Sequence, residues 1–102
     1  MHEKQDTEAN GADLSIMIPE IITSARTGDY AQTASLLNRF LQHLQQELAK
    51  GYIDAGGLSK ITYSLETLLS MQQMENWVAF ADILEFEFLP LWRELSGDAQ
   101  ST

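Results

Sequence analysis

The apolar residues of the chain recur at helical spacing in four stretches, which are separated by glycine-containing or polar breaks. In the second stretch, Asp29 is placed to cap the N-terminus of a helix and Gly51 is placed to end it. The apolar positions between them are separated by four, three, four, three and four residues, which is the a/d spacing of helices packed side by side. These positions are Tyr30, Ala34, Leu37, Leu41, Leu44 and Leu48.

The fourth stretch repeats this spacing after Asn76, which takes the place of the capping residue. Its apolar positions are Trp77, Ala81, Leu84, Phe88, Leu91 and Leu95. Each lies 47 residues after its counterpart, as residue 77 does after residue 30, and the same shift relates the first stretch to the third. The matched positions there are Leu14, Ile18, Ile21 and Ile22, then Ile61, Leu65, Leu68 and Leu69. A duplicated hairpin would produce this match, and so would the chance alignment of two amphipathic helices.

The pattern predicts an all-α protein, namely a four-helix bundle built from two similar antiparallel helical hairpins. Two hairpins are too few for an open solenoid, so we expect them to close on each other. Residues 12–96 are predicted to form a single helical domain, with residues 1–11 and 97–102 as mobile tails. Pro19 predicts that the first helix begins or kinks at that residue, and Pro90 predicts a bend near Phe86 to Pro90.

The charge of the chain restricts its partners. Fifteen acidic residues against six Lys and Arg give a net charge of −9, and the basic residues are scattered singly along the chain. Phosphate backbones and anionic lipid surfaces repel such a chain, so we expect neither nucleic acid nor a membrane as a partner. The sequence has no cysteine and no apolar segment that looks like a signal peptide or a membrane span, which favours a cytoplasmic protein.

The titratable residues offer little for catalysis or metal binding. His43 and Glu47 share a helix face, but a metal site needs three or four ligands, and the Glu-x-x-His motif of di-iron bundles is absent. Asp82, Glu85 and Glu87 are expected to point in different directions around the fourth helix, so they cannot meet on one cation without help from another chain. Motifs for phosphate loops, dinucleotide binding and nucleophile elbows are also missing. We therefore predict no catalytic residue, no cofactor and no metal ligand.

The fourth helix carries more apolar surface than one buried face explains. Beyond its a/d stripe it holds further large apolar side chains on the opposite side and on both flanks, where Pro90 also lies. One interpretation is that the N-terminal segment or the loop at Tyr52 and Ile53 folds over this surface. The other is that the surface binds another polypeptide. In that case the predicted partner-binding residues are Val78, Ile83, Phe86, Leu89, Trp92 and Arg93.

Two runs of sequence carry a resemblance to known proteins. The run Arg26-Thr27-Gly28-Asp29-Tyr30-Ala31, followed by a Leu-rich amphipathic helix, resembles the hairpin junctions of helical-repeat adaptors, and residues 76–85 are similar to it. The overall plan resembles the small acidic helical bundles of the bacterial flagellar export-chaperone type. That resemblance implies a cytoplasmic protein that holds one aggregation-prone subunit, and it implies no particular binding residues.

These observations together predict a protein-binding module, such as an adaptor, a chaperone or a small regulatory subunit. It would offer an apolar helix face with an acidic rim to a partner helix or to a second copy in a homo-oligomer. The alternative is a small bundle enzyme or a ligand or metal carrier with an internal polar site. That alternative requires His43, Glu47 or Glu87 to cluster in the interior.

Overall fold

The computed structural model describes residues 11–96, with side chains from Leu14 onward, and this part of the chain is all-α. The first three helices are α1 (Gly11–Arg26), α2 (Tyr30–Leu48) and α3 (Ala55–Gln73). A fourth helical stretch covers residues 77–96 and is divided into α4 (Trp77–Ile83), the π-helical segment η2 (Leu84–Phe88) and α5 (Leu89–Ser96). The predicted tails lie outside the described residues, apart from Gly11, which begins α1. No helix in the described range is long and apolar enough to cross a membrane.

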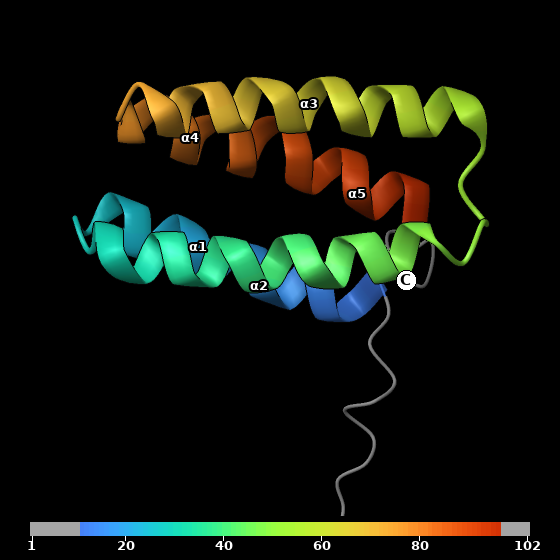
Figure 1. Ribbon diagram of the computed structural model, residues 1–102, viewed down its shortest axis with the longest axis horizontal. Coiled ribbons are helices and arrows are strands. Elements are labelled where there is room, and N and C mark those ends of the chain that lie inside the picture. The colour runs from blue at the N-terminus through green and yellow to red at the C-terminus, as the bar shows by residue number, and fades with distance from the viewer. Residues whose placement is uncertain (1–10, 97–102) are drawn as a thin grey trace, which may run out of the picture.

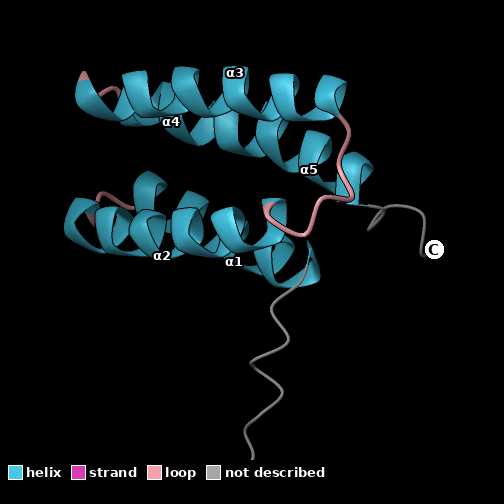
Figure 2. Cartoon of the chain, turned by 45° about the vertical axis from the view of Figure 1, so that its right-hand side comes forward, coloured by secondary structure: helices cyan, strands magenta, loops and turns pink. Residues whose placement is uncertain are grey.

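The helices form two layers around one core. Helices α1 and α2 lie side by side in one layer, and α3 lies along the fourth helical stretch in the other (Figures 1 and 2). Helix α1 also packs against all three segments of the fourth stretch, which joins the two layers. The α1–α2 turn and the α3–α4 turn lie at the same end of the molecule, opposite the α2–α3 connection (Figure 1). The largest fully buried side chains are Trp92, Phe40, Phe80 and Phe88.

We predicted that the first helix either begins or kinks at Pro19; because α1 continues through this residue, the first of these alternatives is wrong. The Pro19 ring is exposed, while Leu14, Ile18 and Ile21 on the other side of the helix are at most 1% exposed. Proline has no N–H to donate to the carbonyl of Ser15, one turn earlier. Burial of this apolar face offsets the loss of that hydrogen bond.

The turns at the common end have the same hydrogen-bond pattern 47 residues apart. The predicted caps are confirmed: Asp29 Oδ1 accepts from the N–H of Gln32, and Asn76 Oδ1 accepts from the N–H of Ala79, both at 3.2 Å. The backbone angles agree closely, with φ −87° and ψ 76° at Asp29 and φ −90° and ψ 78° at Asn76. All four backbone hydrogen bonds that close the first turn recur in the second with this shift. The similarity of these junctions, predicted from the sequence, therefore extends to their atoms.

The buried face of α2 differs from the predicted stripe by one position. Tyr30 is exposed and Leu41 and Leu48 are only half-buried, whereas Phe40 is fully buried and Glu47 is 4% exposed. Each residue advances by about 100° around an α-helix. The predicted a/d spacing is therefore right, but the predicted stripe is one residue away from the buried position at these residues. The buried residues of α2 are Thr33, Leu37, Phe40, Leu44 and Glu47.

The predicted stripe of the fourth stretch holds as far as Phe88 and then fails. Leu91 and Leu95 are half-buried, whereas Leu89 and Trp92 are buried. The cause is the π-helical segment, in which the N–H of Leu89 donates to the carbonyl of Leu84, five residues earlier. A π-turn contains one more residue than an α-turn, so every later side chain moves round the helix by one position. The segment overlaps the region before Pro90 where we predicted a bend.

The α2–α3 connection is held by a buried carboxylate and a close helix approach. Glu47 accepts a hydrogen bond from the Tyr52 hydroxyl at 2.7 Å and forms an ion pair with Lys50 at 3.1 Å. At the start of α3, a Cβ on Gly57 would lie 2.8 Å from Ile53 Cγ2 and 3.1 Å from Leu95 Cδ2, so only glycine fits without a shift. The loop therefore packs toward the end of α5 and leaves Phe86 exposed.

Candidate interaction face on the fourth helical stretch

The structure divides the six predicted partner-binding residues into three groups by exposure. Val78 and Phe86 are 71% and 67% exposed, and Arg93 is exposed as well. Ile83 is half-buried and packs against the core. Leu89 and Trp92 are 9% and 0% exposed and belong to the core of their own chain. Their assignment to an outer face was wrong, because the prediction continued a regular α-helix through residues 84–88, where the π-turn rotates them inward.

A continuous exposed line nevertheless runs along this stretch. Its residues are spaced by four, four, four and three positions, which places them on one side of a helix. We call them the exposed strip: Val78, Asp82, Phe86, Pro90 and Arg93. The opposite side of the same stretch is anchored in the core through Phe80, Leu84, Phe88 and Trp92. The strip therefore lies on a rigid support.

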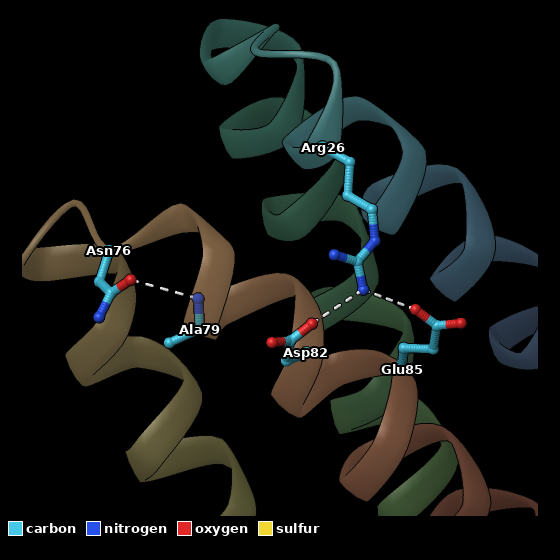
Figure 3. A network of polar contacts seen from close by, with 5 residues as sticks. All are labelled: Arg26, Asn76, Ala79, Asp82 and Glu85. Atoms are coloured by element: carbon cyan, nitrogen blue, oxygen red, sulfur yellow. Dashed lines mark hydrogen bonds and ion pairs between the residues drawn. The ribbon is translucent and has the colours of Figure 1, made fainter.

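Two carboxylates, Asp82 in the strip and Glu85 beside it, bind one guanidinium. Nη2 of Arg26, at the end of α1, donates to Asp82 Oδ1 at 3.1 Å and to Glu85 Oε1 at 2.6 Å (Figure 3). The expectation that Asp82 and Glu85 point apart was wrong, because residues three positions apart lie next to each other on one side of a helix. The hydrogen bonds to Glu85 and Asp82 raise the pKa of Arg26. With two negative charges against one positive charge, this group keeps a formal charge of −1.

The turn end of the strip is aromatic. Tyr30 and Trp77 stack with ring centroids 4.7 Å apart and planes 10° from parallel, and Trp77 also meets Phe80 edge to face at 5.3 Å. A shallow hollow of about 300 Å³ opens beside the stack. Its lining residues are Ala25, Arg26, Tyr30, Trp77 and Val78. Apolar and aromatic surface thus continues from Val78 onto the neighbouring turn, where a large side chain could rest.

The residues considered for metal or acid–base chemistry are not brought together. Glu47 is engaged by Tyr52 and Lys50 at the end of α2. Glu87 is exposed at a groove between α3 and the fourth stretch, and His43 is half-buried on α2, where its Nδ1 has no hydrogen-bond partner. Within residues 11–96, no group of three or more His, Asp or Glu side chains could hold a metal ion.

Sequence reasoning missed the inward position of Trp92, and the sequence offers no clear signal for it. In the sequence the shift of 47 continues to Leu95, with Leu44 matching Leu91 and Leu48 matching Leu95. In the structure the buried pairs Phe40/Phe88 and Leu44/Trp92 lie 48 residues apart, because the π-turn adds one residue to the second helix.

The comparisons with known proteins add no relative. No protein-family model matches the chain, and neither does a curated protein or a solved structure. The exposed strip and its surroundings are therefore the basis on which a function is inferred.

Proposed function

We propose that this chain is a non-catalytic protein-binding module of the cytoplasm, and that it presents the exposed strip to a helix of another polypeptide. The observation that carries the proposal is the exposure of Phe86 and Val78, at 67% and 71%, on a helix whose other side is fully packed. Single exposed apolar residues are common on protein surfaces. Here they follow one another along a rigid helix and continue into an aromatic stack.

The chemistry of the strip suits an interface between helices. Aromatic and arginine side chains are enriched at the centres of protein interfaces, and a charged rim surrounds them. Phe86 and Pro90 supply the apolar centre, while Asp82 and Arg93 supply charges on either side. A partner helix would bring anchors of its own at spacings of three, four and seven residues.

We further propose that the support for this strip is a four-helix bundle of two similar antiparallel hairpins. The packing of α1 on α2 and of α3 on the fourth stretch supports this arrangement, as does the recurrence of one turn geometry at residues 29 and 76. In such a bundle the strip needs no folding step before it binds. Binding then avoids the entropy cost of ordering a flexible segment.

The net charge of −9 favours a partner that contributes basic side chains to the contact. The same net charge keeps the protein soluble while these apolar residues are exposed and no partner is bound. The resemblance to small acidic bundles of the flagellar export-chaperone type agrees with such a role. On that view the module would hold one subunit rather than act on a substrate.

A photo-crosslinking amino acid at position 86 tests the proposal in cells of the source organism. The matched control is position 63 on α3, where Tyr63 is an aromatic residue that is 71% exposed and does not belong to the strip. We expect a discrete crosslinked species from position 86 that disappears when Val78→Asp is added. Equal products from positions 86 and 63, or none from position 86, would contradict the proposal.

A further inference from the structure

We propose that the partner of the exposed strip is the same strip of a second copy, paired antiparallel about a two-fold axis. In this pairing Asp82 faces Arg93 of the second copy, and Phe86 lies on Pro90 of the second copy. The inference rests on the proposed function, because it names the occupant of the surface proposed there. It follows from the order and the charges of the side chains along the strip.

The order of residues makes the strip complementary to itself. From its N-terminal end it reads acidic, apolar, apolar, basic: Asp82, Phe86, Pro90 and Arg93. When two such helices run antiparallel, Asp82 is four residues from Phe86, and the facing Arg93 is three residues from the facing Pro90. The ion pair and the apolar contact therefore fit the same antiparallel alignment of the two helices to within one residue. A two-fold axis makes each contact occur twice.

The charges at the two ends of the strip are not balanced by other residues within the described range 11–96. Asp82 and Glu85 share the single guanidinium of Arg26 and keep a formal charge of −1. Arg93 forms no ion pair with any residue that the structure describes. An arginine from a second copy would neutralise the acidic end, and the second copy's acidic end would neutralise Arg93. The formal charges of Arg26, Asp82, Glu85 and Arg93 would then sum to zero on each copy, with every one of these groups facing an opposite charge.

This local balance is unusual for so acidic a chain. The whole sequence has six Lys and Arg against fifteen acidic residues, yet two of the six, Arg26 and Arg93, border or belong to the strip. Across the interface, two arginines from each copy meet two carboxylates from each copy. Glu87 lies at the groove toward α3 and thus outside the line of contact. A second copy can therefore approach the strip even though the net charges of the two copies repel each other.

The size of the strip limits the strength of the pairing. One helix from each copy buries less than the roughly 1,200 Å² of total surface found in standard stable interfaces. We therefore expect a reversible dimer with a Kd on the order of tens of micromolar or weaker.

Charge reversal tests the register directly by sedimentation at concentrations spanning this range. Asp82→Arg alone and Arg93→Asp alone each place like charges opposite each other twice, and each should weaken self-association at least tenfold. An equimolar mixture of the two variants should form a heterodimer about as well as the original chain pairs, because every facing pair is again of opposite charge. Arg39→Asp, an exposed charge reversal on α2, serves as the control and should change little.

Failure of the mixture to associate would overturn the antiparallel register, and so would an Arg39→Asp effect as large as that of Arg93→Asp. Circular dichroism of the Asp82→Arg variant checks that loss of the Arg26 contact leaves the fold intact. Because the chain has no cysteine, a second measurement is available. Phe86→Cys mixed with Pro90→Cys should form a mixed disulfide faster than Phe86→Cys mixed with Glu66→Cys on α3, and equal rates would count against the pairing.

The outcomes also separate this inference from the proposed function. A chain that stays monomeric at every concentration, while position 86 crosslinks to a different polypeptide, refutes the second copy and leaves the binding function standing. A chain that stays monomeric and gives no crosslink from position 86 refutes both. A dimer that follows the charge-reversal pattern supports both.

Discussion

Phe40 of α2 and Phe88 of η2 meet edge to face in the core, with ring centroids 5.5 Å apart and planes at 78°. They are 48 residues apart, whereas the stacked pair Tyr30 and Trp77 is 47 residues apart. The difference of one residue is taken up by the π-helical segment Leu84–Phe88. The two aromatic pairs thus form at positions with different offsets, because the π-turn shifts the register of the fourth stretch by one residue.

Deleting Glu87 should leave the fold intact. The deletion removes the extra residue of the π-turn, so Phe88, Leu89 and Trp92 keep their inward direction on a regular α-helix. We expect the melting temperature to change by about 5 °C or less, with the tryptophan emission maximum of the protein unchanged. Deleting exposed Gln42 from α2 is the control. It should cost more than about 3 kcal/mol, because Leu44 and Glu47 would rotate out of place. Similar losses from both deletions would contradict this view of the π-turn.

Leu89→Asp and Phe86→Asp should have opposite consequences for stability, although both residues belonged to the predicted partner site. Leu89 is 9% exposed, so an aspartate there places a carboxylate without a partner in the core and should cost more than about 3 kcal/mol. Phe86 is mostly exposed, and its replacement should change the free energy of unfolding by about 0.5 kcal/mol or less. Urea titration of the two variants measures the difference. A strongly destabilised Phe86→Asp variant would remove Phe86 from the exposed strip.

Glu75→Gly should stabilise the protein. Glu75 has φ 58°, a left-handed conformation that costs a residue with a Cβ about 1–2 kcal/mol. Gly28, at the matching position of the first turn, has φ 84° without that cost. After allowing for the greater freedom of glycine in the unfolded chain, we expect a gain of roughly 0.5–1 kcal/mol by chemical denaturation.

Glu75→Ala separates the backbone effect from loss of the charge and should bring no comparable gain. Gly28→Ala should lose about 1–2 kcal/mol, because alanine pays the cost that glycine avoids. A gain from Glu75→Ala equal to that from Glu75→Gly would assign the effect to the carboxylate instead.

The stability of the α2–α3 connection should fall at high pH. Burial raises the pKa of the Tyr52 phenol above its ordinary value near 10, and the hydrogen bond to the Glu47 carboxylate raises it further. The folded state therefore favours the neutral phenol. Its contribution is complete below about pH 10 and is lost as the pH rises through the raised value.

Tyr52→Phe should cost about 1 kcal/mol at neutral pH, because buried Glu47 loses one hydrogen bond. The variant should also lose less stability than the original chain between about pH 9 and pH 11. Denaturant titrations at several pH values give both results, and the variant keeps Tyr30 and Tyr63 as common background. Parallel pH curves for the two chains would show that Tyr52 does not contribute.

The sequence by itself determined the features that depend on neighbouring residues. The helical class follows from apolar spacing within each stretch, and the caps at Asp29 and Asn76 follow from side chains that bind a backbone N–H three residues later. The equivalent turns 47 residues apart belong to the same class of local features. Each was predicted because the interacting groups lie within a few residues of each other.

Only the tertiary structure decided which apolar residues of the fourth stretch are core and which are surface. A side chain's direction depends on the helix rotation accumulated before it, so one π-turn moved Leu89 and Trp92 inward and left Phe86 outside. The ion pairs of Asp82 and Glu85 likewise required Arg26, more than fifty residues earlier in the chain. Such relationships arise from packing between helices, and periodicity within one helix does not contain them.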